Sequence, residues 1–223
     1  MLLRSLIDFL FPPHCLLCED EIESGFICED CLEEFVEIGP PLCPNCGRPK
    51  KKQCGCRDTH LDWIRGWVYY QPPVDRLIQE FKYHNKPSLA KFLGRKMAAV
   101  IRGDPHYHRI DLVVPIPLHP RRRWERGYNQ SELLARAVGK ELGLLVDNPL
   151  IRVRDNPSQT GLTETERKKN VAGIFEVKGG MSGKVILLVD DVMTTGATIE
   201  EGARVLKEAG ALAVLGAVVA IAP

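Results

Sequence analysis

Residues 186–198 have the sequence ILLVDDVMTTGAT, and they predict both a type of sheet and the place of a ligand site. An apolar run typical of a central parallel strand is followed directly by two carboxylates, Asp190 and Asp191. A hydroxyl-rich loop then enters a helix, where backbone N–H groups and the positive end of the helix dipole attract anions. Gly196 allows close approach of the backbone, and open α/β sheets bind ligands at this end of their strands. The alternative is an acidic surface turn capped by threonine, which leaves the position of the two carboxylates unexplained.

Strands and helices alternate on the N-terminal and C-terminal sides of this stretch. Strands are expected at 64–70, 112–118, 184–189 and 213–221, and helices at 74–84, 88–102, 129–142 and 199–209. Pro115 and Pro117 suggest that the second strand gives way to a loop. This alternation is typical of a doubly wound parallel sheet with helices on its faces, and we expect residues 61–223 to form that domain.

One segment of this domain does not follow the pattern. Residues 154–173 are polar and have neither helical nor strand periodicity. A loop of this length in a compact domain is usually functional or disordered. We therefore expect it to be mobile without a ligand.

The cysteines predict a metal-binding module in residues 1–60. All eight lie between positions 15 and 56, in short-range pairs. A two-residue spacer lets both sulfurs of a pair face one ion, and four thiolates satisfy a tetrahedral zinc, so we expect two closed, structural sites. Sequential pairing is favoured over a cross-braced arrangement, which stays open. His14, beside Cys15, is an alternative ligand, but we expect it to be a bystander. The expected ligands are Cys15, Cys18, Cys28, Cys31, Cys43, Cys46, Cys54 and Cys56.

The overall composition is that of a globular protein without a general affinity for polyanions. The 223 residues carry a formal net charge of +1, and 26% of them are charged. Residues 1–13 lack the uninterrupted apolar run and the cleavage site of an export signal. The apolar segment 211–222 is too short to span a membrane. We expect a cytoplasmic protein with reduced thiols and no membrane span.

The stretch 186–198 resembles the motif with which type I phosphoribosyltransferases bind 5-phosphoribosyl-1-pyrophosphate (PRPP). By this resemblance, Asp190 and Asp191 bind the ribose 2′- and 3′-hydroxyls, and Mg²⁺ accompanies the ligand. The residues that would cradle the 5′-phosphate are Thr194, Thr195, Gly196, Ala197 and Thr198. The motif marks PRPP binding and leaves turnover open.

Further segments resemble the ComF family, which combines a double zinc ribbon with a type I phosphoribosyltransferase-like parallel sheet flanked by helices. They are the cysteine pairs, residues 70–82, 114–117 (VPIP), 126–130 (RGYNQ), Gln159 and 166–170. The resemblance covers nearly the whole chain. It implies a role in DNA uptake or use of external DNA, with competence machinery proteins as partners. An active phosphoribosyltransferase for an unidentified base or amine and a PRPP-responsive regulator without turnover are both open.

The resemblance also assigns basic residues to the pyrophosphate group. Residues 117–123 occupy the position of the pyrophosphate loop, and its candidates are Arg121, Arg122, Arg123 and Arg126. The loop 154–173 occupies the position of a segment that closes over PRPP, and Arg167 and Lys168 are its candidates for neutralising the leaving group. In each case the alternative is a solvated basic loop.

Local positive charge also favours weak contact with single-stranded DNA. The basic residues are Lys50–Lys52, Arg57 and Arg121–Arg123. Such runs bind nucleic-acid phosphates, but we expect no aromatic row beside them for stacking of bases.

Overall fold

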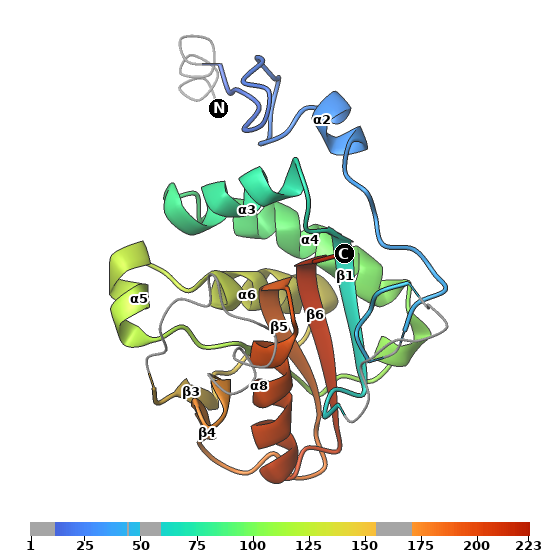
Figure 1. Ribbon diagram of the computed structural model, residues 1–223, viewed down its shortest axis with the longest axis vertical. Coiled ribbons are helices and arrows are strands. Elements are labelled where there is room, and N and C mark those ends of the chain that lie inside the picture. The colour runs from blue at the N-terminus through green and yellow to red at the C-terminus, as the bar shows by residue number, and fades with distance from the viewer. Residues whose placement is uncertain (1–11, 44, 50–58, 155–170) are drawn as a thin grey trace.

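The computed structural model describes residues 12–43, 45–49, 59–154 and 171–223, and a four-stranded sheet lies at its centre (Figure 1). The strand order is β1-β6-β5-β2, and every pairing is parallel. The strands are β1 (Trp63–Tyr69), β2 (Leu112–Pro115), β5 (Val185–Met193) and β6 (Ala213–Ile221). The prediction of a parallel α/β fold is confirmed.

Helices cover both faces of this sheet. On one face lie α3 (Val74–Tyr83), α4 (Leu89–Arg102) and α6 (Gln130–Leu142), and on the other lies α8 (Ala197–Glu208) (Figure 1). Leu187 and Val189 of β5 belong to the buried cluster that includes residues of α3, α4 and α6. Ile186 and Leu188 belong to the cluster that includes residues of α8. A strand covered on both faces must be apolar throughout, which explains its sequence. Among the described residues, no helix combines the length and the apolar character needed to cross a lipid bilayer.

Several short elements complete the fold. They are α2 (Glu29–Glu33), the 3-10 helix η1 (Pro105–Tyr107), α5 (Pro120–Arg126) and the antiparallel pair β3 (Leu150–Arg152) and β4 (Phe175–Val177). The expectation of a loop through Arg123 was wrong, because α5 begins at Pro120. Proline is well suited to the first position of a helix, where its missing N–H removes no hydrogen bond.

Two boundaries near residues 186–198 also differ from expectation. The strand β5 continues to Met193, so Asp190 and Asp191 lie within it and not beyond its end. The helix α8 begins at Ala197, two residues earlier than predicted, and it therefore includes Thr198. Both shifts place the two carboxylates and the Thr198 hydroxyl on regular elements, whereas Thr194 and Thr195 lie in the loop between them.

The N-terminal region packs along the free edge of β1. The backbone N–H of Ile38 donates to the Trp67 carbonyl at 2.9 Å, and the N–H of Tyr69 donates to the Val36 carbonyl at 3.0 Å. The rings of Phe35 and Trp67 are 5.6 Å apart. These contacts cover a strand edge that would otherwise expose unpaired backbone groups.

Candidate functional site

Asp190 lies where β5 continues past the end of β2. The pairing of these strands ends at Pro115 and Val189. Beyond it, the hydroxyl of Ser131, in the first turn of α6, donates a 2.7 Å hydrogen bond to Oδ1 of Asp190. Burial raises the pKa of Asp190 to about 7, and the charge of Asp191 acts in the same direction. Asp190 therefore changes its charge near neutral pH.

Asp191 is paired with Lys82, near the end of α3. The Lys82 Nζ lies 2.9 Å from Oδ2 of Asp191, and the two side chains are 22% and 11% exposed. Burial lowers the pKa of Lys82, but the charge of Asp191 outweighs this effect and the pKa is raised overall. Lys82 was not among the predicted site residues. The only sequence signal was its place in the ComF-like segment 70–82.

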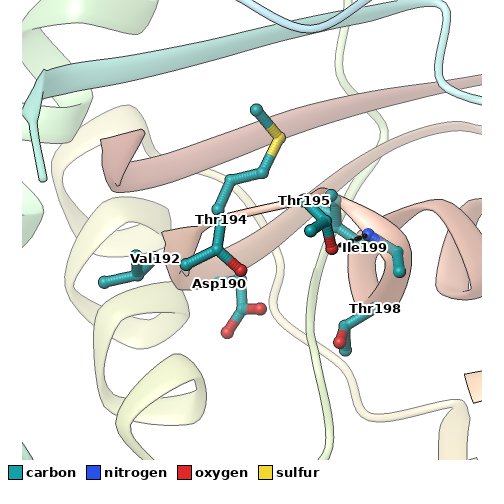
Figure 2. A pocket seen from close by; sticks show the side chains of 9 residues that line it. Asp190, Val192, Thr194, Thr195, Thr198 and Ile199 are labelled. Carbon is teal, nitrogen blue, oxygen red and sulfur yellow. Dashed lines mark hydrogen bonds between the residues drawn. The ribbon is translucent and has the colours of Figure 1, made fainter. Parts of the chain in front are cut away.

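The loop after β5 forms a pocket at the start of α8 (Figure 2). It is open to solvent, and the empty space among its lining residues, open solvent included, is about 230 Å³. Gly196 has the left-handed φ of 82°, which few other residues adopt without strain, and it precedes the first turn of α8. The lining residues are Asp190 and the continuous run from Val192 to Ile199.

This pocket suits an anion with sugar-like hydroxyl groups. The start of α8 carries the positive end of its dipole, and the side chains of Thr194, Thr195 and Thr198 line the pocket in Figure 2. The Thr195 hydroxyl accepts a 3.4 Å hydrogen bond from the backbone N–H of Ala197. The predicted phosphate loop and Asp190 thus line one pocket.

Residues 126–130 join α5, α6 and the end of α3. The Tyr128 hydroxyl donates to the Phe81 carbonyl at 2.6 Å. Asn129 caps α6 by accepting from the N–H of Ser131 at 3.2 Å, and its amide donates to the Ile116 carbonyl at 3.0 Å. This segment therefore fixes the position of Ser131 beside Asp190.

The predicted pyrophosphate arginines lie on or at the end of α5 and have different neighbours. Arg126 lies over the Tyr83 ring at 4.8 Å and donates to its hydroxyl at 3.1 Å. Its charge also acts on Lys82, which places it near the acid pair. Arg121 pairs with Glu125 at 3.2 Å, and Arg123 pairs with Glu132 at 3.3 Å. Arg126 is thus the member of this group most clearly associated with the Asp191 side of the site.

The predicted closing loop connects β3 and β4. Residues 155–170, including Arg167 and Lys168, lie outside the described residues. Near its C-terminal end, the Gly173 N–H donates to Oε1 of Glu201 at 2.6 Å. Arg204 donates to both oxygens of Glu201 at 2.8 Å, so α8 anchors this end of the loop.

The first four cysteines form a cluster in the N-terminal module. The sulfur atoms of Cys15, Cys18, Cys28 and Cys31 all lie within 4.8 Å of one another, and those of Cys18 and Cys28 are 3.7 Å apart. Tetrahedral coordination with Zn–S distances of about 2.3 Å separates sulfurs by about 3.8 Å. The donor set therefore fits zinc, and its four thiols suggest a closed, structural site.

The other predicted set is only partly described. Cys43 and Cys46 are both buried and lie on one turn, whereas Cys54 and Cys56 lie outside the described residues. The alternative ligand His14 is engaged elsewhere, since its Nδ1 lies 2.8 Å from the Glu19 carbonyl. The sequential pairing is the one that the first cluster displays.

Known families match both parts of the chain. A double zinc ribbon domain matches residues 6–60, and a phosphoribosyl transferase domain matches residues 129–223. Among solved structures, glutamine PRPP amidotransferase from B. subtilis is 22% identical with a TM-score of 0.43. The match covers 62% of this chain and 30% of that one.

Several curated relatives match over most of their length. Competence protein F of Haemophilus influenzae is 29% identical over 88% of this chain and 92% of the relative. The DNA utilization protein YhgH of Escherichia coli K12 is 32% identical over 91% of this chain and 94% of the relative. Competence protein ComFC of Bacillus subtilis is 30% identical over 88% of this chain and 89% of the relative.

Proposed function

The chain belongs to the ComF family, with competence protein F, ComFC and YhgH as relatives, and from this premise we propose that it binds PRPP with Mg²⁺ at the carboxyl end of β5. The binding would serve the uptake or use of DNA, as the names of the relatives indicate. We further propose that it acts in the cytoplasm, where thiols are kept reduced for zinc.

The junction of β5 with α8 carries this proposal. It combines the pocket lined by threonine side chains, the start of a helix and two carboxylates within one strand. Asp190 and Asp191 would accept hydrogen bonds from the ribose hydroxyls, and residues 194–198 would bind the 5′-phosphate. Bound Mg²⁺ would neutralise part of the pyrophosphate charge.

The basic residues near the acid pair have a second role in the proposal. Lys82 and Arg126 would attract the pyrophosphate group from the side of α3 and α5. Arg121, Arg122 and Arg123 of α5, and Arg167 and Lys168 of the loop between β3 and β4, stay candidates for the same group. Lys82 would have to share its charge between Asp191 and the ligand.

Calorimetric titration with PRPP and Mg²⁺ tests the site. Replacing both Asp190 and Asp191 by Asn should weaken binding by about 1–3 kcal/mol for each charge-assisted hydrogen bond lost. Asp111→Asn is a matched control, because Asp111 accepts from the Val185 N–H at the opposite end of β5. Equal affinity of the wild type and the double variant would refute the proposed ribose site.

A second measurement separates the enzyme from the regulator. Pyrophosphate release from PRPP should be followed with a panel of bases, with ammonia and with single-stranded DNA ends. Steady release with one acceptor would identify a phosphoribosyltransferase. Tight PRPP binding without release would identify a protein that responds to PRPP without turning it over.

Single-stranded DNA is a second candidate ligand, and exposed aromatic side chains on and beside α5 favour it. Trp124 is 86% exposed among the arginines of α5, and Tyr83 is 62% exposed beside Arg126. We expected no aromatic row beside the basic runs, and the structure places these two exposed aromatic side chains there. Aromatic rings bind bases by stacking, and arginines bind phosphates. The surface of α5 therefore offers both kinds of contact that bind single-stranded DNA.

A further inference from the structure

The side chain of Arg48 connects the N-terminal module to the phosphate loop. Its Nη2 donates to the Thr194 carbonyl at 2.5 Å, and its Nε donates to the Ala222 carbonyl at 2.8 Å. Thr194 is the first residue after β5 and lines the pocket, and Ala222 directly follows β6. One guanidinium therefore bridges the ends of two neighbouring strands at the candidate site.

The backbone of Arg48 is held by the turn that carries Cys43 and Cys46. The Cys43 N–H donates to the Arg48 carbonyl at 2.8 Å, and the Gly47 N–H donates to the Cys43 carbonyl at 2.9 Å. Gly47 has a φ of 65°, and a Cβ there would lie 2.9 Å from the Ile64 carbonyl oxygen. The cysteine turn therefore packs closely against the sheet, and its backbone geometry determines the position of the Arg48 backbone, from which the side chain extends.

We infer that Arg48 is a positioning residue through which the cysteine turn orders the phosphate-binding loop. A trans peptide group directs its C=O and N–H to opposite sides, so a guanidinium bound to the Thr194 carbonyl also fixes the direction of the Thr195 N–H. Arg48 itself does not line the pocket. It therefore acts on the loop from outside the pocket, and the inference rests on the proposed binding of PRPP there.

Metal binding at the cysteine turn should then be linked to ligand binding. Cys43 and Cys46 are proposed zinc ligands, and loss of the ion would free the turn that positions Arg48. Coupling between two binding sites is reciprocal, so PRPP should in turn retain the ion bound by these cysteines. The carrier of this coupling is a single side chain, which makes it accessible to mutation.

Arg76 provides a matched control for Arg48. Like Arg48, it joins the N-terminal module to the α/β domain, because its Nη1 donates to the backbone carbonyl of Leu17 at 2.6 Å. That contact lies on α3 and involves no residue lining the pocket. Arg76→Ala should therefore loosen the module without disturbing the loop at 194–198.

The first test is calorimetric titration of PRPP with Mg²⁺ into four proteins: wild type, Arg48→Ala, Arg48→Lys and Arg76→Ala. We expect Arg48→Ala to bind at least tenfold more weakly and Arg76→Ala to bind within twofold of the wild type. Arg48→Lys keeps the charge but lacks the planar fork that bridges two carbonyls, so it should resemble Arg48→Ala. Wild-type affinity of Arg48→Lys would reduce the role to charge alone and overturn the positioning role.

The second test needs no ligand. Amide hydrogen exchange in the free protein should be faster at residues 195–198 in Arg48→Ala and unchanged there in Arg76→Ala. If the wild type binds no PRPP, the proposed function fails, but this exchange pattern still decides whether Arg48 orders the loop. Unchanged exchange in a folded Arg48→Ala protein would overturn the inference.

The third test follows zinc release to a colorimetric chelator. PRPP should slow the release of one zinc equivalent in the wild type, and this protection should disappear in Arg48→Ala. Protection that persists in Arg48→Ala, or no protection in a wild type that binds PRPP, would refute the coupling between the two sites.

Discussion

At the scale of single residues, Asp190 and Asp191 are adjacent carboxylates with different neighbours. Asp191 is paired with Lys82, whereas Asp190 lies beside the Ser131 hydroxyl and has a pKa raised to about 7. A ribose hydroxyl donates a hydrogen bond more strongly to a carboxylate than to a carboxylic acid. Ionisation of Asp190 should therefore accompany ligand binding.

We expect PRPP affinity to rise about tenfold between pH 6 and pH 8. With a pKa of about 7, Asp190 is mostly protonated at the lower pH and mostly ionised at the higher pH. The apparent affinity for PRPP scales with the fraction of protein in which Asp190 is ionised. Titration calorimetry across this range measures the change.

The phosphates of PRPP titrate in the same range, so the control is Asp190→Asn. This variant keeps the titration of the ligand and loses that of the side chain. Its affinity should change much less with pH than that of the wild type. Parallel pH profiles for the two proteins would show that Asp190 does not titrate on binding.

Lys82→Met should destabilise the fold by about 3 kcal/mol, because it leaves the largely buried Asp191 without its cation. Urea unfolding measures the free energy of unfolding. Adding Asp191→Asn to the variant should restore part of the loss.

The control for Lys82 is Lys207→Met. Lys207 lies 2.7 Å from Asp62, but this pair is 26% and 44% exposed, so its removal should change stability by less than about 1 kcal/mol. A similar loss in the two variants would mean that burial of the Lys82–Asp191 pair has no special effect.

The site residues that lie close together in the sequence could be predicted, and those from distant elements could not. Asp190, Asp191 and the threonines all lie within residues 190–198, so their pattern predicts an anion site directly. Lys82 and Ser131 come from helices far away in the sequence, and only tertiary packing brings them to the carboxylates. Neither stands in a recognisable spacing with the acid pair, so no sequence motif connects them with it.

At the scale of elements, the junction of β5 and α8 depends on Gly196. Its φ of 82° is strained for any residue with a Cβ, and that Cβ would lie 3.4 Å from the Met193 sulfur. Gly196→Ala should cost about 1–2 kcal/mol of stability and also weaken PRPP binding severalfold, because relief of strain would move the loop. Thermal unfolding and calorimetry measure the two effects.

Gly143→Ala is the matched control for this strain. Gly143 ends α6 with a φ of 70°, and nothing lies within 4 Å of a Cβ placed there. The backbone strain should be similar, but PRPP affinity should stay unchanged because α6 ends away from the pocket. Equal losses of affinity in the two variants would indicate a general effect of stability.

The long elements could be predicted because their periodicity is strong, and the short ones could not. Buried strands such as β6 and amphipathic helices such as α4 match their expected ranges closely. In contrast, α5 has seven residues without a buried face, and β3 and β4 have three residues each. Segments this short carry too few residues to show a period, and their structure depends on neighbouring elements.

At the scale of the whole molecule, the N-terminal module shares the core of the α/β domain. Cys15, Leu17 and Cys31 belong to the same buried cluster as Leu77 and Phe81 of α3. Loss of metal from the first cysteine set should therefore affect the stability of both parts of the chain, since packing transmits the change.

Metal analysis of the protein purified under reducing conditions should find about two zinc ions per chain. Cys31→Ser should lower the content to about one and reduce the melting temperature, because a closed four-thiolate site does not tolerate loss of a ligand. His14→Ala should keep both ions, since its Nδ1 lies beside the Glu19 carbonyl. Full zinc content in Cys31→Ser would contradict the assignment of this cluster.

Two basic segments of the chain, Lys50–Lys52 and Arg121–Arg123, are candidates for contact with single-stranded DNA. Lys50–Lys52 lie outside the described residues, whereas α5 presents Trp124, 86% exposed, directly after three consecutive arginines. With a net charge of only +1, binding should be weak and local. Its log–log salt slope should be about −0.7 for each phosphate neutralised.

Fluorescence anisotropy at low and moderate salt distinguishes the surfaces. If α5 binds the strand, Trp124→Ala should lower affinity with little change of the salt slope, because stacking is lost while charge is kept. Changing Arg121–Arg123 to Ala should reduce both affinity and slope. A loss confined to the Lys50–Lys52 variant would place the contact on the N-terminal module, and no binding at low salt would leave the PRPP pocket as the only supported ligand site.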